Sequence, residues 1–170
     1  EGWIGALRAL LLAFDPKSGK RLPRFNFSKV RPKGAPLKMM GGLASGPEPL
    51  IRMLTHITRA LSYNNGRPIT AATICDVMNM IGACVVSGGV RRSSQIFLGQ
   101  ATEEFLGLKD QSALQALRAG PMSEEVLSKI AQHPMTTHRW ASNNSVFAHF
   151  GMNYSEVADR IAHNGEPGLV

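Results

Sequence analysis

The sequence predicts a helix-rich α/β protein, and three observations support this prediction. Apolar residues recur at helical spacing in several segments, short stretches rich in Ile, Val and Phe lie between some of them, and clusters of Gly, Pro and Asn separate the segments. The 170 residues are 44% hydrophobic and 18% charged, a composition typical of a folded globular chain. The sequence shows no internal repeat, low-complexity tract or domain boundary.

Three helices are predicted in the first half of the chain. The first starts near Trp3 and should end at Phe14, because Pro16 restricts the residue before it. The second is predicted by an apolar stripe at Leu50, Leu54, Ile57 and Leu61. The third should begin after Thr70 as N-cap and end at Gly88-Gly89, and its apolar stripe is Ile74, Met78, Ile81 and Val85.

The remaining elements are predicted from shorter patterns. A basic connector covers Lys17 to Pro36, and FNFSKV (residues 25–30) within it is a candidate strand. SSQIFLG (93–99) and SNNSVFAHF (142–150) are also predicted to be strands. SEEVLSKIAQH (123–133) and SEVADRIAHNG (155–165) are predicted to be helices, with N-caps at Ser123 and Ser155.

The overall charge points to an anionic partner. The chain carries 19 Lys and Arg against 12 Asp and Glu, a net charge of +7 that suits nucleic acid, nucleotide phosphates or an acidic surface. The longest apolar run, Leu7 to Phe14, is too short to cross a membrane. Two cysteines without close spacing favour a reducing, cytoplasmic location, and the five histidines lack metal-binding spacing, so no metal site is predicted. Because the chain starts at Glu1 and not at Met, we expect a longer protein.

Three stretches are candidates for binding, and each has a simpler structural interpretation. GGLASGPEPL (41–50) precedes a predicted helix. Either the free N–H groups at the start of that helix bind phosphate, or the stretch is a plain loop before the helix. SGGVRR (87–92) combines backbone freedom with guanidinium donors for an anion, or it ends a helix with two solvated arginines. HRWASNNSV (138–146) offers donors and acceptors to a polar substrate, or it satisfies its own loop backbone. None of them matches the phosphate-binding or dinucleotide-binding glycine motifs.

Five segments taken in order resemble one enzyme family. They are EGWIGALRALLLA, KVRPKGAPLKMMGGLASGPEPL, GGVRRSSQIFLG, HRWASNNSV and NGEPGLV. Together they resemble the adenosylcobalamin-dependent (class II) ribonucleotide reductases, most closely the monomeric kind that acts on ribonucleoside triphosphates. The resemblance implies a ten-stranded α/β barrel, of which residues 1–170 would form part of the catalytic domain. Residues 111–137 look expanded, and we expect them to form one or two added surface helices.

The resemblance also implies roles for particular residues. In this family a deoxynucleotide effector bound at a specificity site selects the base of the substrate, and two loops communicate between effector and substrate. The loops match GGLASGP and SGGVRRSSQ, so the implied residues are Gly41, Gly42, Ser45, Gly46, Ser87, Gly88, Gly89, Arg91 and Arg92. Ser142, Asn143 and Asn144 are expected near the substrate. The radical-bearing cysteine of the family lies in a loop beyond NGEPGLV, so no catalytic residue is expected here.

The implied reaction replaces the ribose 2′-OH by hydrogen. Adenosylcobalamin would initiate a thiyl radical, and a thioredoxin-like protein would supply the reducing equivalents. The cofactor is expected to bind mainly to parts outside these residues. Cys75 and Cys84 are predicted to have no redox role, because nine residues on one helix place them about 13 Å apart, too far for a disulfide.

Two alternatives remain open from the sequence. The diphosphate-reducing and iron-dependent branches of the reductase superfamily share the two loops, although RWASNNS favours the triphosphate branch. A basic nucleic-acid-binding module would also explain the charge, but only 6% of the residues are aromatic and no nucleic-acid-binding motif appears. We therefore expect neither nucleic acid nor a membrane as a partner.

Overall fold

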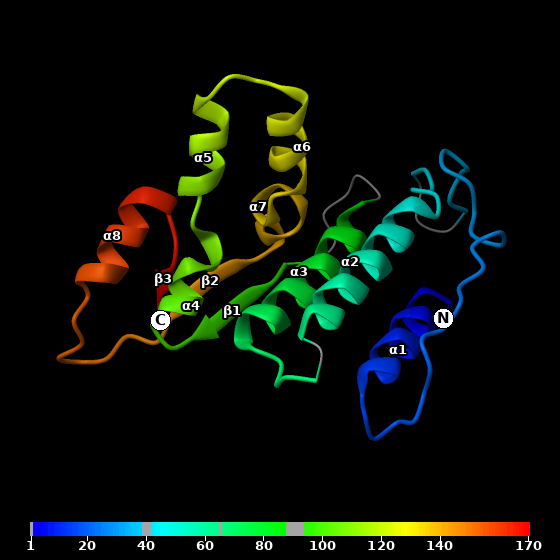
Figure 1. The fold of residues 1–170 in the computed structure, drawn as a ribbon, viewed down its shortest axis with the longest axis horizontal. Coiled ribbons are helices and arrows are strands. Elements are labelled where there is room, and N and C mark those ends of the chain that lie inside the picture. Colours follow the sequence, from blue (N-terminus) through cyan, green and yellow to red (C-terminus); the bar gives the residue numbers. More distant parts are fainter. Residues whose placement is uncertain (1, 39–41, 65, 88–93) are drawn as a thin grey trace. The chain divides into compact units, whose positions relative to one another are not determined.

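The computed structural model describes residues 2–38, 42–64, 66–87 and 94–170 (Figure 1). The chain forms two compact units. Unit 1 consists of Glu1–Ile69 and Cys84–Arg92, and unit 2 consists of Thr70–Ala83 and Ser93–Val170. This division has no signal in the sequence, because one uninterrupted helix runs across the boundary at Ala83.

Two helices form the core of unit 1. The helix α1 (Gly2–Phe14) ends at the predicted residue, and α2 (Glu48–Asn64) packs against it. Leu10 of α1 is 1% exposed, and the whole predicted stripe of α2 is buried. The periodicity therefore predicted both helices and the buried face of α2, whereas Trp3 and Leu11 of the apolar stripe in α1 are exposed.

The segment between α1 and α2 is irregular. It contains one isolated antiparallel bridge, between Pro36 and Leu43, and the predicted strand at 25–30 is wrong. Local hydrogen bonds replace a partner strand there. The side chain of Asn26 accepts from the N–H of Ser28, and the carbonyl of Phe27 accepts from the N–H of Val30, so the chain turns.

The helix α3 (Ala71–Val86) belongs to unit 2 up to Ala83. The predicted N-cap is confirmed, because Thr70 Oγ1 accepts from the N–H of Thr73 at 3.2 Å. The stripe predicted from its periodicity does not mark the buried face. Ile74, Met78 and Val85 are exposed, whereas the buried residues are Cys75, Asn79, Met80, Gly82 and Cys84. Since α3 is apolar on several sides, its periodicity does not single out one face.

Unit 2 contains a parallel sheet with the strand order β1-β2-β3. Its strands are β1 (Ile96–Gly99), β2 (Asn143–Val146) and β3 (Gly168–Leu169). Both strands predicted for this region are confirmed over shorter spans, whereas β3 was not predicted. Ile96 pairs with Asn143, and Ser145 pairs with Gly168. The described residues thus form a mixed α/β structure with a three-stranded sheet, and they do not by themselves show a ten-stranded barrel.

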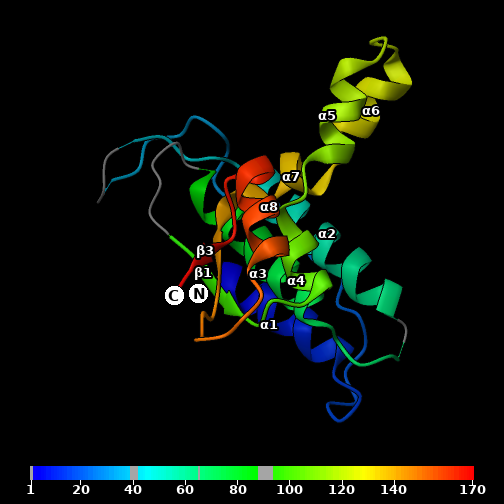
Figure 2. The same cartoon turned by 90° about the vertical axis from the view of Figure 1, so that its left-hand side faces the viewer.

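Short helices connect β1 to β2. They are α4 (Glu103–Leu106), the 3₁₀ turn η1 (Gly107–Lys109), α5 (Ser112–Ala119), α6 (Glu124–Gln132), α7 (Pro134–Thr137) and the 3₁₀ turn η2 (Arg139–Ala141). The helices α5 and α6 pack side by side and extend away from the sheet (Figure 2). They lie in the region where surface helices are expected. The predicted N-cap at Ser123 is confirmed, because its side chain accepts from the N–H of Val126.

The last helix, α8 (Ser155–Asn164), joins β2 to β3. Its predicted N-cap is wrong by one residue, because Tyr154 takes that position and Ser155 is already helical. The Asn153 side chain precedes the helix and accepts from the N–H of Ser155 at 3.0 Å. Gly165 ends the helix with a φ of 74°, a conformation that favours glycine.

The core of unit 2 lies where α3, α4, β2 and α8 meet. It consists of Cys75, Phe105, Leu106, Leu108, Val146 and Val157. Val146 is fully buried, which fixes the central strand against the helices. None of the described helices is long and apolar enough to span a membrane.

Candidate functional site

Unit 1 contains an open cavity of about 1040 Å³, bordered by α1, the basic connector and the loop before α2. Three of the predicted specificity-loop residues line it, namely Ser45, Gly46 and Ser87. Gly42 is not in the wall. The predictions for Gly41, Gly88, Gly89, Arg91 and Arg92 fall outside the described residues.

The connector contributes cationic and aromatic side chains to a cavity wall that is otherwise mostly apolar. Arg24, Lys29 and Arg31 line it, and none of them has an ion-pair partner among the residues that the structure describes. Phe25 and Phe27 also line it, with ring centroids 6.1 Å apart. Guanidinium and ammonium groups attract phosphate oxygens, and aromatic faces accept a planar base. The cavity therefore suits a nucleotide.

The loop before α2 requires glycine at one position. Gly46 has a φ of 81°, and a Cβ atom there would lie 2.5 Å from Glu48 Oε2 and 3.1 Å from Lys33 Cβ. Both the conformation and the close approach of the connector exclude a larger residue. The absence of a side chain at Gly46 thus allows the loop to approach Lys33 of the basic connector closely at the edge of the cavity.

The positive charge of the chain is concentrated in unit 1. This unit carries 14 of the 19 Lys and Arg residues but only 3 of the 12 Asp and Glu residues, whereas unit 2 carries 5 and 9. The net charge of +7 is therefore the difference between a strongly basic unit and an acidic one. A basic unit with an open cavity favours an anionic ligand.

Ser142, Asn143 and Asn144 lie together in unit 2, at the start of the central strand. Ser142 is 1% and Asn144 is 4% exposed, whereas Asn143 is exposed. Ser142 Oγ and Asn144 Oδ1 are buried and have no hydrogen-bond partner among the described residues. Buried polar atoms normally have partners, so these two atoms are candidates for contact with a polar ligand.

Lys109 fixes the backbone on both sides of this segment. Its ammonium group is buried and donates to the carbonyls of Arg139 and Ser142, and it lies 3.9 Å from Glu166. Glu166 Oε2 accepts from the N–H of Asn144 at 3.0 Å. Burial lowers the pKa of Lys109, while the Glu166 carboxylate opposes that shift. Lys109, at the end of η1, thus contacts both η2 and Glu166, which lies shortly before β3.

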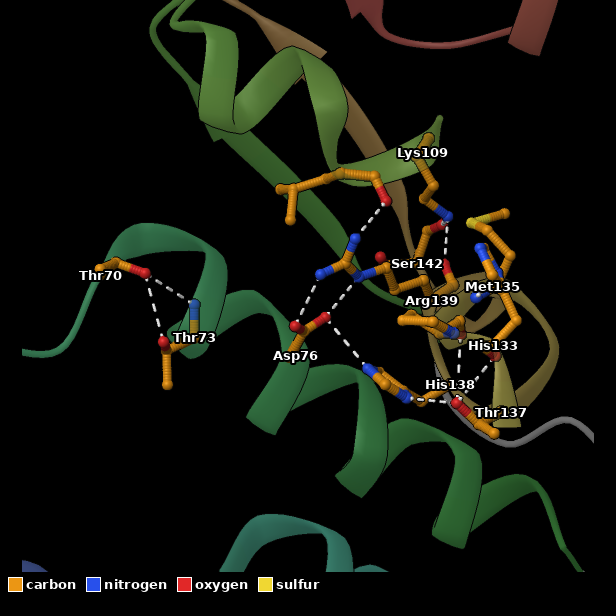
Figure 3. Close-up of polar contacts among 12 residues, drawn as sticks. Thr70, Thr73, Asp76, Lys109, His133, Met135, Thr137, His138, Arg139 and Ser142 are labelled. Atoms are coloured by element: carbon orange, nitrogen blue, oxygen red, sulfur yellow. Dashed lines mark hydrogen bonds and ion pairs between the residues drawn. The ribbon is translucent and has the colours of Figure 1, made fainter. Parts of the chain in front are cut away.

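Asp76 on α3 forms a second set of contacts with the η2 turn, through Arg139 (Figure 3). Arg139 donates to both of its carboxylate oxygens, at 2.6 and 2.8 Å, and also to the carbonyl of Leu108. Burial by itself raises the pKa of Asp76, but the hydrogen bonds from Arg139 and His138 outweigh it and lower the pKa to about 2. Asp76 is therefore ionised at neutral pH.

Both ring nitrogens of His138 are engaged in this network. Nε2 lies 3.0 Å from Asp76 Oδ1, and Nδ1 lies 2.7 Å from Thr137 Oγ1 (Figure 3). His138 is therefore not free to bind a metal. Across residues 2–38, 42–64, 66–87 and 94–170, no group of three or more His, Cys, Asp or Glu side chains is arranged to hold a metal ion.

Cys75 and Cys84 both lie in α3, as predicted, and both are buried free thiols. Burial raises the pKa of Cys84 to about 11, and burial together with the Asp76 carboxylate raises that of Cys75. Thiolates are the reactive form of cysteine. These directions support the prediction that neither residue has a redox role, which stays a prediction.

Comparison with known proteins gives the family. Residues 1–61 match the model of the insertion domain of B12-dependent ribonucleotide reductases. The chain is 40% identical over 170 residues to the adenosylcobalamin-dependent ribonucleoside-triphosphate reductase of Euglena gracilis, an alignment that covers 99% of the chain and 21% of that protein. The corresponding enzyme of Lactobacillus leichmannii is 35% identical over 175 residues, covering 100% of the chain and 21% of that protein. The chain belongs to the adenosylcobalamin-dependent ribonucleotide reductases.

The similarity to other members of this family is equally extensive. The probable adenosylcobalamin-dependent ribonucleoside-triphosphate reductase of Dictyostelium discoideum is 39% identical, over 99% of the chain and 20% of that protein. The chain thus spans about a fifth of the length of these reductases. No solved structure matches it.

Several residues of the candidate site were not predicted from the sequence. The cationic side chains of the cavity come from a segment interpreted as a connector with a candidate strand, although two phenylalanines between basic residues in RFNFSK (24–29) were a usable signal. Asp76, Lys109 and Glu166 had no such signal. Their partners lie 22 to 63 residues away in the sequence, and only the fold brings them together.

Proposed function

We propose that the chain is part of an enzyme that reduces ribonucleoside triphosphates to 2′-deoxyribonucleoside triphosphates with adenosylcobalamin as cofactor. The observation that carries this proposal is the identity of 34–40% over essentially the whole chain to reductases of that description. The alignments cover 99–100% of the chain and therefore extend over both loop segments and the polar segment at 142–144.

We propose further that the cavity of unit 1 receives the deoxynucleotide effector. Support comes from its three cations, which have no ion-pair partner among the described residues, from its two phenylalanines, and from the loop residues Ser45, Gly46 and Ser87 at its edge. The positive charge of unit 1 would attract the triphosphate of the effector, and Phe25 or Phe27 would pack against its base.

The segment Ser142–Asn144 is proposed to lie at the substrate. The two buried oxygens without partners, Ser142 Oγ and Asn144 Oδ1, would then contact ribose or phosphate groups. Lys109 and Glu166 would hold the backbone of this segment in place, so that these atoms do not have to be ordered when the substrate binds.

No site among the described residues is assigned to the cobalamin cofactor. The buried His138 has both ring nitrogens in use, and the unit 1 cavity carries three cationic side chains suited to phosphate. The cofactor is therefore assigned mainly to parts of the reductase outside these residues, and no chemical step is assigned to this chain. A thioredoxin-like reductant is proposed for the same enzyme.

The full-length enzyme, supplied with adenosylcobalamin and a thioredoxin system, tests this function. Reduction of the four ribonucleoside triphosphates would be measured with each deoxynucleotide effector, for the wild type, Arg91→Ala and Arg92→Ala. Each substitution should reduce effector-dependent base selection more than it reduces basal turnover. The free energy of one charged hydrogen bond is comparable to a typical allosteric coupling energy.

Three results would contradict the proposal in different ways. Wild-type selectivity in both arginine variants would show that these residues are structural. Preference for ribonucleoside diphosphates would assign the enzyme to the diphosphate-reducing branch of the superfamily. Salt-dependent binding to nucleic acid that exceeds binding to deoxynucleotides would favour a nucleic-acid-binding module.

A further inference from the structure

Glu166 places a carboxylate beside the segment Ser142–Asn144. It belongs to the stretch NGEPG (164–168), which runs from the end of α8 to the start of β3. Its Oε2 atom accepts from the N–H of Asn144 at 3.0 Å and lies 3.9 Å from Nζ of Lys109. The carboxylate of Glu166 is therefore part of the region proposed to lie at the substrate.

Only one of the two carboxylate oxygens of Glu166 is used within the described part of the chain. Both contacts named above are made by Oε2, whereas Oε1 has no hydrogen bond or ion pair with a described residue. The side chain is 24% exposed, so solvent reaches part of it. The hydrogen bond from Asn144 restricts rotation of the carboxylate, which reduces the entropy lost when Oε1 binds a ligand. Oε1 is thus an oriented acceptor that a ligand can reach.

The backbone around Glu166 fits closely against the central strand. Gly168 begins β3 and is the register partner of Ser145, and a Cβ atom at Gly168 would lie 2.8 Å from Ser145 Oγ. A side chain there would displace either β3 or the Ser145 hydroxyl. Since Glu166 lies two residues before Gly168, this close contact keeps its carboxylate within reach of Asn144.

The unused polar atoms around Glu166 are oxygens. Ser142 Oγ and Asn144 Oδ1 are buried and have no partner among the described residues, and Oε1 of Glu166 adds a third oxygen. Carboxylate and amide oxygens only accept hydrogen bonds, and a serine hydroxyl can accept as well as donate. The ammonium group of Lys109 is already used by the carbonyls of Arg139 and Ser142. A ligand that fits this region must therefore supply donors.

A ribonucleoside triphosphate carries two kinds of donor, the ribose hydroxyls and the amino groups of some bases. Its phosphate oxygens are acceptors, and a carboxylate repels them. Uracil has no amino group, whereas all four ribonucleotides share the ribose hydroxyls. Acidic side chains accept hydrogen bonds from ribose hydroxyls in other nucleotide sites. The ribose is therefore the part of the substrate that matches these oxygens for every base.

We propose that Glu166 binds the ribose of the substrate, with Oε1 accepting a hydrogen bond from the 2′- or the 3′-hydroxyl. This inference rests on the proposed function, and it narrows the contact at Ser142–Asn144 from ribose or phosphate to ribose. Glu166 is a substrate-binding residue in this arrangement. Lys109 is a positioning residue, which lies beside the Glu166 carboxylate and holds the backbone next to it.

Competitive inhibition of the full-length holoenzyme tests the proposal, with the effector held at saturation so that added nucleotides compete only at the active site. For each base, the inhibition constants of the 2′-deoxy and 3′-deoxy nucleoside triphosphates would be divided by the KM of the ribonucleotide. We expect one of these ratios to fall about 10-fold in Glu166→Gln, because one charged hydrogen bond is lost. Glu166→Asp keeps the charge but withdraws it by one methylene group, and it should lower the same ratio.

The ratio separates a contact with ribose from a structural effect. A general distortion of the site weakens ribonucleotides and deoxy analogues alike and leaves the ratio unchanged. Glu156→Gln makes the same chemical change at an exposed residue of α8 and should keep both the KM and the ratio. Thermal unfolding identifies a variant that does not fold, and Glu166→Asp carries the test if Glu166→Gln is lost. The wild-type ratios need no variant.

The outcomes distinguish this inference from the function on which it rests. If both Glu166 variants keep the wild-type ratios, or if the wild type binds both deoxy analogues as tightly as the ribonucleotide, the inference is wrong and the proposed function stands. A loss that spares the uracil nucleotides would assign Glu166 to the base and would also overturn it. If the wild type reduces no ribonucleoside triphosphate, the proposed function fails, and the role of Glu166 fails with it.

Discussion

Both units contain lysine and arginine side chains, but those of unit 1 lie at an open cavity, whereas those of unit 2 are paired within the fold. In unit 1, Arg24, Lys29 and Arg31 surround an open cavity without ion-pair partners among the described residues. In unit 2, Lys109 and Arg139 are partly or fully buried and contact carboxylates and carbonyl oxygens of the chain. The difference follows from composition, since unit 1 has 3 acidic residues for 14 basic ones.

This comparison teaches how a binding cation differs from a structural one. A buried cation must have its partners within the fold, because burying an unpaired charge is costly. A cation at an open cavity keeps its hydration until an anion arrives. Substitutions in unit 2 should therefore reduce stability, and substitutions in unit 1 should reduce binding.

The largest expected effect is at Lys109. Replacing it with methionine keeps an unbranched apolar side chain of similar size but leaves Glu166 and two backbone carbonyls without their cation. We expect Lys109→Met to lower the free energy of unfolding by about 3 kcal/mol, measured by urea denaturation of the full-length enzyme. Lys129→Met is the matched control. Its exposed pair with Glu125 should contribute less than about 0.5 kcal/mol, and equal losses in both variants would refute the comparison.

A smaller effect is expected at Asp76, and it depends on pH. The pKa of Asp76 is lowered from 3.8 to about 2 in the folded protein. The carboxylate therefore stabilises the fold above about pH 4, and this contribution is lost as the pH falls towards 2. Asp76→Asn should lower the free energy of unfolding at pH 7 by about 2 kcal/mol.

The pH profile provides the check on Asp76. The difference in unfolding free energy between wild type and Asp76→Asn should shrink between pH 4 and 2. Asp159→Asn, which changes an exposed carboxylate beside His163, serves as control and should give a nearly constant difference. A constant difference for Asp76→Asn as well would mean that its ionisation does not stabilise the fold.

The smallest expected effect on stability is at Arg31. Arg31→Ala should change the free energy of unfolding by less than about 0.5 kcal/mol, because Arg31 has no ion-pair partner among the described residues. Affinity for a deoxynucleoside triphosphate should nevertheless fall about 10-fold, as one charged hydrogen bond is lost. Titration calorimetry on the full-length enzyme would measure it. Lys20→Ala, at an exposed residue outside the cavity wall, should leave the affinity unchanged.

Much of the fold was predictable because its signals are local. The stripe from Leu50 to Leu61, the N-caps Thr70 and Ser123, and the stop before Pro16 each depend on a few neighbouring residues. The strand at 25–30 failed because Asn26 satisfies the backbone locally, which an apolar and aromatic pattern does not reveal. The network around Lys109 was unpredictable because every partner is distant in sequence.

The parallel sheet of unit 2 also imposes an order on folding. Ile96 and Asn143 pair across residues 97–142, and Ser145 and Gly168 pair across residues 146–167, so neither pair can start from a tight turn. Each doubling of such a loop adds only about 0.6 kcal/mol, but both closures must precede any gain from strand pairing. The helices on either side form from local contacts and need not wait for the sheet. We therefore expect the segment Ser142–Asn144 to be ordered late, and partial opening to release this segment while most helices remain.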